Sequence, residues 1–222
     1  MIWPSICVDN FFDDPVKVKE FAYSLEYKKD EEGKWPGYRT GGMHKVDFKF
    51  FNWTTLKIIS LLYPMNYRDV SWTAEQTFQR IPGKTFKNKG WVHKDYEEEL
   101  TAIIYLSNHR DCGTSLYRPK KFGNKVINEE LKRGILLNKR MNNKKNLEEE
   151  KYLNENNDQF EKILEFKSIF NRLVIFDSHN FHAAENFYNE DLNEDRLTLI
   201  TFFKHINMTN IKYPITEMKR IQ

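Results

Sequence analysis

The pattern of apolar and polar positions divides the chain into a helical first part and a later part rich in strands. Apolar residues recur at three- and four-residue spacing after Asp14-Pro15, a pair typical of a helix start, and again over Thr54–Leu62. From Ser71 onward the spacing changes to two or to short continuous runs, as is typical of strands. We therefore predict helices within residues 1–70 and a sheet structure after them.

Five segments after residue 70 have the composition and length of strands. They are Trp72–Ile81, Leu100–Leu106, Thr114–Tyr117, Arg172–Phe176 and Arg196–Phe203. Short strands of this kind favour an antiparallel sandwich or barrel, so we predict a mainly β fold with flanking helices. The segment 34–43, which is rich in Gly, Pro and aromatic residues, is predicted to be an ordered loop and is a candidate for the mouth of a site.

A polar segment, Lys120–Ser168, interrupts the strands. Only 15 of its 49 residues are apolar, and its basic residues exceed its acidic ones by three, which equals the formal net charge of the whole chain. We predict one or two solvated helices here, with an amphipathic helical piece over residues 160–167 packed on the barrel. We treat the chain as one domain, 1–222, composed of a helical flank (1–70), a β core (71–118 and 172–206) and this insertion (120–168), whose ends should meet in space.

Composition indicates a globular protein and leaves its partner open. The chain has 222 residues, of which 40% are hydrophobic and 15% aromatic, so a wholly disordered chain is excluded. A net charge of +3 is too small to indicate nucleic acid or anionic lipid. Cys7 and Cys112 allow at most one disulfide, the start of the chain lacks the basic residues of a signal peptide, and no apolar run is long enough to span a membrane. We expect a cytoplasmic protein without membrane association.

Three polar features of the strand region could share one site. They are His93-Lys94-Asp95, His182 shortly after a strand, and Arg196 at the start of a strand. Two imidazoles and one carboxylate on one side of an iron ion leave coordination positions open, and non-haem Fe(II) oxygenases use these positions. A His-x-Asp motif alone is weak, because a single histidine is more often structural or exposed than a ligand.

The order of these residues resembles the 2-oxoglutarate- and Fe(II)-dependent dioxygenase superfamily, and within it the prolyl-hydroxylase-like group. It is also similar to small members encoded by bacteriophages and marine bacteria. The resemblance covers about Trp72 to Lys204 without the insertion. It implies a double-stranded β-helix, a jelly-roll and cupin-like core, with His93, Asp95 and His182 as the ligands of Fe(II).

The same resemblance implies 2-oxoglutarate as cosubstrate. Arg196 would pair with the carboxylate remote from iron, because its planar guanidinium suits a buried carboxylate. Tyr105 corresponds to the tyrosine whose hydroxyl joins this carboxylate. Thr198, two residues after Arg196 and on the same strand face, would add a second hydroxyl.

Two positions leave alternatives open. The tyrosine that often precedes the Pro-Gly turn is Ile81 here, so one cosubstrate contact is absent or supplied by Gln79 or Gln76. His179 is a rival to His182 as the distal ligand, although His182 fits the motif better.

The implied activity is hydroxylation of an unactivated C–H bond with O2 as oxidant, release of succinate and CO2, and ascorbate as supporting reductant. The expected substrate is a protein side chain such as proline, or a small metabolite. Nucleic acid is disfavoured, because Phe202 stands where demethylases of the superfamily carry a second arginine. The alternatives are a zinc site with the same ligands and a non-enzymatic jelly-roll binding module. Cys112 is disfavoured as a nucleophile, because only His109 lies near it in the chain.

Overall fold

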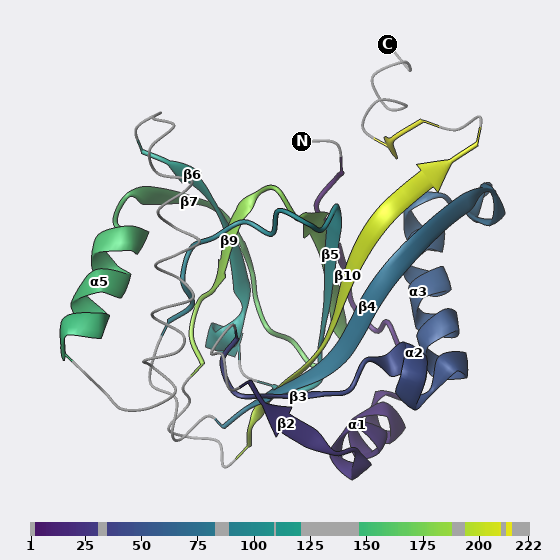
Figure 1. Cartoon of the computed structure of the whole chain (residues 1–222), viewed down its shortest axis with the longest axis horizontal. Helices are drawn as coiled ribbons and strands as arrows, with labels where there is room; N and C mark the ends of the chain where they lie inside the picture. The colour runs from purple at the N-terminus through teal and green to yellow at the C-terminus, as the bar shows by residue number, and fades with distance from the viewer. Residues whose placement is uncertain are drawn as a thin grey trace.

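Two antiparallel sheets face each other, and helices cover the outer face of the larger sheet (Figure 1). The computed structural model describes residues 3–30, 35–82, 89–108, 110–120, 147–187, 194–209 and 212–214. Within these ranges the larger sheet has seven strands in the order β1-β8-β5-β10-β4-β3-β2, and the smaller sheet has three in the order β7-β6-β9. This arrangement confirms the predicted mainly β fold with a jelly-roll core.

The elements have the following bounds. The larger sheet consists of β1 (Ile6–Val8), β2 (Tyr27–Lys29), β3 (Tyr38–Thr40), β4 (Val70–Ile81), β5 (Leu100–Tyr105), β8 (Arg172–Asp177) and β10 (Arg196–Met208), and the smaller of β6 (Thr114–Pro119), β7 (Phe160–Phe166) and β9 (Phe181–Ala184). The helices are α1 (Pro15–Ser24), α2 (Met43–Val46), α3 (Phe48–Leu62) and α5 (Leu147–Asn157), with short 3-10 turns η1 (Tyr67–Asp69) and η2 (Arg110–Cys112). No helix in the described ranges combines the length and the apolar composition needed to cross a lipid bilayer.

Alternation along β10 gives the larger sheet two different faces. Leu197, Leu199 and Phe203 are buried in a cluster with side chains of α1 and α3. Ile200 and Phe202 lie on the opposite face and line a cavity toward the smaller sheet. Because successive side chains of a strand point to opposite faces, one strand builds both the core under the helices and the wall of the cavity.

The two predicted N-terminal helices are present, and one begins earlier than the apolar pattern indicated. Pro15 opens α1, and the Asp14 carboxylate accepts a hydrogen bond from the Lys17 amide at 3.1 Å. Helix α3 begins at Phe48 rather than Thr54, because the Asp47 carboxylate accepts a hydrogen bond from the Phe50 amide at 3.0 Å and caps an additional turn and a half of mostly aromatic residues.

The structure corrects two expectations. The segment 34–43 was predicted to be a loop, but it contains β3, which pairs with β4. The piece 160–167 was predicted to be an amphipathic helix, but it forms β7, which pairs with β6 from Pro119↔Phe160 to Thr114↔Phe166. Ile163 and Leu164, the apolar residues that suggested the helix, are exposed on this strand.

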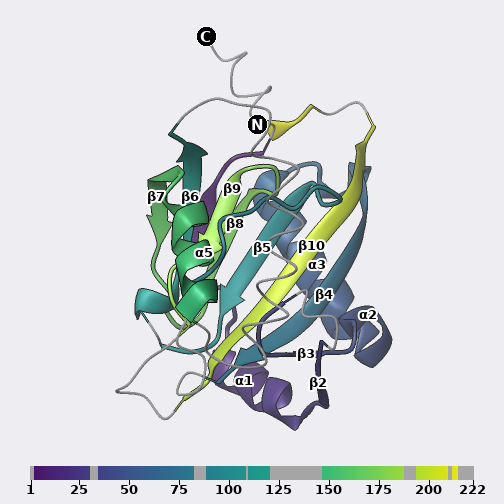
Figure 2. The ribbon, with the colours of Figure 1, turned by 60° about the vertical axis from the view of Figure 1, so that its left-hand side comes forward.

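The two ends of the insertion do not meet as predicted, because they lie beyond opposite ends of the β6–β7 pair, which runs from Pro119↔Phe160 to Thr114↔Phe166. The Lys120 amide donates to the Gln159 carbonyl at 2.9 Å, and the Ser168 amide donates to the Arg110 carbonyl at 3.4 Å. Helix α5 lies beside the smaller sheet (Figure 2), and Figure 1 shows it on the side of the molecule away from α1 and α3. Residues 121–146 of the insertion lie outside the described residues.

Candidate metal centre

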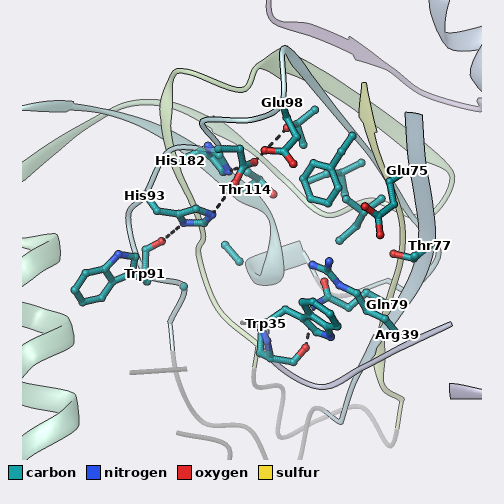
Figure 3. Close-up of a pocket in the computed structure, with 18 of the residues that line it drawn as sticks. Trp35, Arg39, Glu75, Thr77, Gln79, Trp91, His93, Glu98, Thr114 and His182 are labelled. Carbon is teal, nitrogen blue, oxygen red and sulfur yellow. Dashed lines mark hydrogen bonds and ion pairs between the residues drawn. The ribbon is translucent and has the colours of Figure 1, made fainter. Parts of the chain in front are cut away.

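A cavity of about 550 Å³ lies between the two sheets (Figure 3). Its walls come from the inner faces of β4, β5 and β10, from β3, and from β6 and β9 of the smaller sheet. The segment 90–98, which has little regular structure, closes one side. Its volume is in the range of small-molecule sites, which is about 300–1,000 Å³.

Backbone pairing brings His93 and His182 together although they are far apart in sequence. The His93 amide donates to the His182 carbonyl at 3.0 Å, and the His182 amide donates to the His93 carbonyl at 2.8 Å. The Asp95 amide donates to the Ser178 carbonyl at 3.1 Å. The segment around His93 therefore runs antiparallel to β9, and this pairing fixes where the three side chains start.

The side chains of His93, Asp95 and His182 converge on one point. Nε2 of His93 lies 3.6 Å from Oδ1 of Asp95, and Nε2 of His182 lies 3.3 Å from Oδ2 of Asp95. One ligand atom from each residue lies within 4.8 Å of the others. Among the described residues, these three form the group that could hold a metal ion.

Hydrogen bonds at the far side of each ring set the tautomers. Nδ1 of His93 lies 2.7 Å from the Trp91 carbonyl, and Nδ1 of His182 lies 2.9 Å from the Asn180 carbonyl. A carbonyl only accepts, so each Nδ1 carries the proton and each neutral ring turns the lone pair of Nε2 toward Asp95. Two lone pairs and a carboxylate that face one another require a cation between them, which is either a proton or a metal ion.

The charges of the group follow from its geometry. Burial alone would raise the pKa of Asp95, but His182, His93 and Arg39 outweigh burial and lower this pKa to about 2. Burial acts to lower the pKa of His182, but the Asp95 carboxylate raises it above the ordinary value. Burial and the neighbouring His182 lower the pKa of His93. Without a metal ion, His182 is therefore the imidazole that takes up a proton first.

The rival histidine lies apart from this group. The amide of His179 donates to Oδ1 of Asp177 at 3.0 Å, and its Nδ1 lies 3.3 Å from the same oxygen. Its side chain is 53% exposed, whereas that of His182 is 8% exposed. The structure thus places His182, and not His179, beside His93 and Asp95.

Of the predicted cosubstrate residues, Arg196 lines the cavity, whereas Tyr105 and Thr198 do not. Arg196 begins β10, six residues before Phe202, which pairs with Thr101 beside Asp95, so it lies at the end of the cavity away from the metal ligands. Arg196 is only 3% exposed, and its Nε donates to the Cys112 carbonyl at 2.9 Å. No carboxylate among the described residues forms an ion pair with it. Oγ1 of Thr198 is buried without a hydrogen-bond partner in the described part of the chain. A buried cation and an orphaned hydroxyl on one strand face fit a ligand carboxylate.

The structure gives Tyr105 a partner that the sequence did not suggest. Its hydroxyl donates to Oγ1 of Thr114 at 2.8 Å, and Thr114 lines the cavity whereas Tyr105 does not. Thr114 is thus a further hydroxyl near Arg196. Its only sequence signal was its place at the start of a predicted strand.

The two glutamines considered as substitutes for a missing tyrosine point to opposite faces of β4. Gln79 lines the cavity, and its Nε2 donates to the Pro36 carbonyl at 2.9 Å. Gln76 faces the helices, where its Nε2 donates to Oγ1 of Thr201 at 2.8 Å and its Oε1 accepts from Thr54. Gln76 therefore lies on the face of β4 opposite the cavity and does not contact a ligand bound there.

Two other residues lie away from the chemistry. Arg118, at the surface, pairs with Glu161 at 2.9 Å. Cys112 is buried, and burial raises the pKa of its thiol, which disfavours the thiolate that a nucleophile needs. His109 lies outside the described residues.

Comparison with solved structures identifies the fold. The chain is similar to the non-haem α-ketoglutarate-dependent carbocyclase SnoK from nogalamycin biosynthesis (TM-score 0.56, 9% identity, covering 98% of this chain and 86% of that chain). It is also similar to HygX from Streptomyces hygroscopicus with nickel and 2-oxoglutarate bound (0.51, 12%, 94% and 84%) and to a 2OG-Fe(II) oxygenase family oxidoreductase from Burkholderia pseudomallei (0.50, 10%, 93% and 86%). The chain therefore has the fold of these oxygenases.

Comparison of sequences gives a family without an assigned activity. No curated protein sequence matches the chain significantly. One family model, described as a family of unknown function (DUF6445), matches residues 3–203, which is most of the chain. The protein therefore belongs to the DUF6445 family.

Proposed function

We propose that this protein is an Fe(II)- and 2-oxoglutarate-dependent oxygenase that hydroxylates an unactivated C–H bond and releases succinate and CO2. The observation that carries the proposal is the convergence of two imidazole Nε2 atoms and one carboxylate in a cavity whose far end holds the buried Arg196. The similarity of fold to known oxygenases supports it. Its assignment to the prolyl-hydroxylase-like group rests on the order of the motif residues.

His93, Asp95 and His182 would hold the iron, because this donor set suits Fe(II) and leaves coordination positions for ligands. When bound together with 2-oxoglutarate and O2, iron supplies the oxidation of the C–H bond.

The protein contributes orientation around the metal position. The carbonyls of Trp91 and Asn180 hold the two Nδ1 protons and so keep both Nε2 atoms available. Oγ1 of Thr101 donates to Oδ2 of Asp95 at 3.4 Å and lies 2.7 Å from Oγ of Ser178. This bond orients the carboxylate toward the histidines.

At the other end, Arg196 would neutralise the remote carboxylate of 2-oxoglutarate, with Thr198 and Thr114 as neighbouring hydroxyls. Ile103 and Ile200 supply apolar wall between the two ends. When 2-oxoglutarate is held by its remote carboxylate, only its keto acid end is free to reach the metal. This favours chelation in a fixed orientation.

The proposal is tested by succinate formation from 2-oxoglutarate with added Fe(II) and ascorbate. We expect the wild-type protein to form succinate and the variant His182→Ala to lose iron binding and turnover by about a hundredfold or more. His179→Ala is the matched control and should retain both. Failure of the metal-loaded wild type with many protein and small-molecule substrates would support the binding module, and turnover that needs zinc without 2-oxoglutarate would support the zinc alternative.

A further inference from the structure

A second arginine, Arg39, reaches into a part of the cavity that the metal and 2-oxoglutarate do not explain. It lies on β3, opposite Gln79 of β4, and its side chain turns into the cavity (Figure 3). Its Cζ lies 4.5 Å from the centroid of the Trp35 ring and 5.8 Å from that of Phe202. The two aromatic rings hold the guanidinium in place through cation–π contacts.

The charge of Arg39 has no partner among the described residues. Its buried Nε makes no hydrogen bond, and no carboxylate in the described ranges forms an ion pair with it. Burial lowers the pKa of Arg39 to about 10, while Asp95, Glu75 and Asp30 act from farther away in the opposite direction. The group is thus still charged at neutral pH. A partly buried charge that the described residues leave unpaired in a cavity points to an anionic ligand.

Arg39 and Arg196 occupy different places. Arg196 donates to the Cys112 carbonyl, and its Cζ lies 5.7 Å from the ring centroids of both Tyr105 and Phe187. The cation–π contacts of Arg39 are instead with Trp35 and Phe202. The charge of Arg39 contributes to lowering the pKa values of both Asp95 and His93. One cation therefore marks the cosubstrate end and the other a position nearer the metal ligands.

The surroundings of Arg39 favour a singly charged anion. Glu75, on the cavity face of β4, already brings a negative charge toward Arg39. Of the two lysines that line the cavity, Lys204 is paired with Glu98 at 3.2 Å and Glu97 at 3.6 Å, and Lys94 lies over Phe181 with its Nζ 4.2 Å from the ring centroid. A phosphate with two negative charges would be repelled by these acids and would have the single charge of Arg39 to balance it. A carboxylate matches the single charge of the guanidinium and its planar pair of donors.

We propose that Arg39 binds the carboxylate of the substrate, so that the substrate is a small carboxylic acid whose oxidised carbon lies beside the metal. This inference rests on the proposed oxygenase function. Because Arg39 lines a cavity of about 550 Å³, which is in the range of small-molecule sites, the acid is a small molecule rather than a folded protein surface. Arg39 is then a specificity-determining residue, and Arg196 remains the cosubstrate residue.

The test is calorimetric titration of protein loaded with Ni(II) and 2-oxoglutarate. The probes are the protein-forming amino acids, short-chain and cyclic carboxylic acids, the primary amide of each acid, and glycerol phosphate and sugar phosphates. We expect one or more acids to bind at least about tenfold more tightly than their amides. Arg39→Leu should weaken the best acid by about thirtyfold or more, because it leaves the carboxylate unpaired. Arg39→Lys should regain part of this affinity, since it keeps the charge and loses the planar donors.

Three controls separate the roles. Arg196→Leu should weaken the binding of 2-oxoglutarate. Substitution of the exposed Arg118 by Ala should change the affinity for neither 2-oxoglutarate nor the acid. Thermal unfolding checks that Arg39→Leu is folded, and its Tm should stay close to that of the wild type, because removal of an unpaired charge offsets the loss of two cation–π contacts.

Several results would overturn the proposal. If Arg39→Leu and Arg196→Leu weakened the binding of 2-oxoglutarate equally, Arg39 would be a residue of the cosubstrate site. The proposed oxygenase function would still stand. Equal binding of acids and amides, binding of phosphates alone, or no binding by any probe to protein that binds 2-oxoglutarate would also reject it. If the wild type binds neither Ni(II) nor 2-oxoglutarate, the proposed function itself fails, and this is visible before any probe is added.

Discussion

Among single residues, Arg196 gives a direct expectation for the cosubstrate. Its guanidinium is buried and has one carbonyl partner, so a ligand carboxylate would supply its missing counter-charge. Arg196→Leu should weaken 2-oxoglutarate binding to the Ni(II)-loaded protein by about 2–5 kcal/mol, because the carboxylate would then be buried without a partner. Calorimetric titration measures the loss directly. An unchanged Kd would remove Arg196 from the cosubstrate site.

The proton on His182 predicts how metal binding depends on pH. Asp95 raises the pKa of His182, so this ring is protonated at a higher pH than an ordinary imidazole, and the metal must displace that proton. Metal affinity should therefore fall as the pH is lowered through the raised pKa, by about tenfold per pH unit for one proton. Titration of the apo protein with Ni(II) across a pH series measures this.

Two variants check the cause of that pH dependence. Asp95→Asn should move the onset of the decline to lower pH as well as weaken binding, since it removes the charge that raises the His182 pKa. His179→Ala should leave the profile as it is, because His179 pairs with Asp177. A profile that is flat through the imidazole range would contradict the assignment of His182 as a metal ligand.

Residues that a short motif specifies could be predicted, and residues that depend on strand pairing could not. His93 and Asp95 are two positions apart, so a local spacing marks them, and β9 then brings His182 to them. Arg39 and Thr114 have no such spacing. Arg39 lines the cavity only because β3 pairs with β4. The hydroxyl of Thr114 is held in place by the hydroxyl of Tyr105.

Among elements, the long central strands were predictable and the short or edge strands were not. The buried runs of β5, β8 and β10 are rich in apolar and β-branched residues, which suits strands between two packed layers. In β7, by contrast, only the two terminal residues are buried, and its exposed Ile163 and Leu164 imitate a helical period. Pairing with β6 outweighs that local pattern.

The pairing of the metal-ligand segment with β9 leads to a prediction at Gly90. A Cβ at Gly90 would lie 2.5 Å from both the backbone N and O of Ala184, so no side chain fits without moving the segment from β9. Because His93 and His182 pair in the same ladder, Gly90→Ala should weaken metal binding by about tenfold or more and lower stability by about 1–3 kcal/mol. Metal titration and thermal unfolding measure the two effects.

Gly41 provides the matched control for that substitution. A Cβ at Gly41 would lie 3.4 Å from Cγ2 of Val46, which is an ordinary contact, so Gly41→Ala should keep the metal affinity. If Gly90→Ala lost stability but bound metal as the wild type does, the pairing of this segment with β9 would not be what positions the ligands.

For the molecule as a whole, the polar insertion is connected to the metal centre rather than only attached to the surface. Leu153 of α5 packs against Trp91 in a small buried cluster. Nδ2 of Asn156 donates to the Val92 carbonyl at 3.3 Å. The insertion, whose sequence carries the excess positive charge, thus contacts the two residues that precede His93. It also contributes β7 to the smaller sheet.

Asn157 is the residue through which this connection can be tested. Its Oδ1 accepts a hydrogen bond from the Val92 amide at 3.0 Å, and its Nδ2 donates to the Gly90 carbonyl at 2.9 Å. One side chain thus holds the backbone just before His93 in place. Asn157→Ala removes both bonds, each of about 1 kcal/mol, and should weaken Ni(II) binding by about tenfold because a positioning contact of the ligand segment is lost. Asn154→Ala, an exposed position of the same helix, should not change the metal affinity. Equal Kd values for the two variants would show that the metal centre holds its geometry without the insertion.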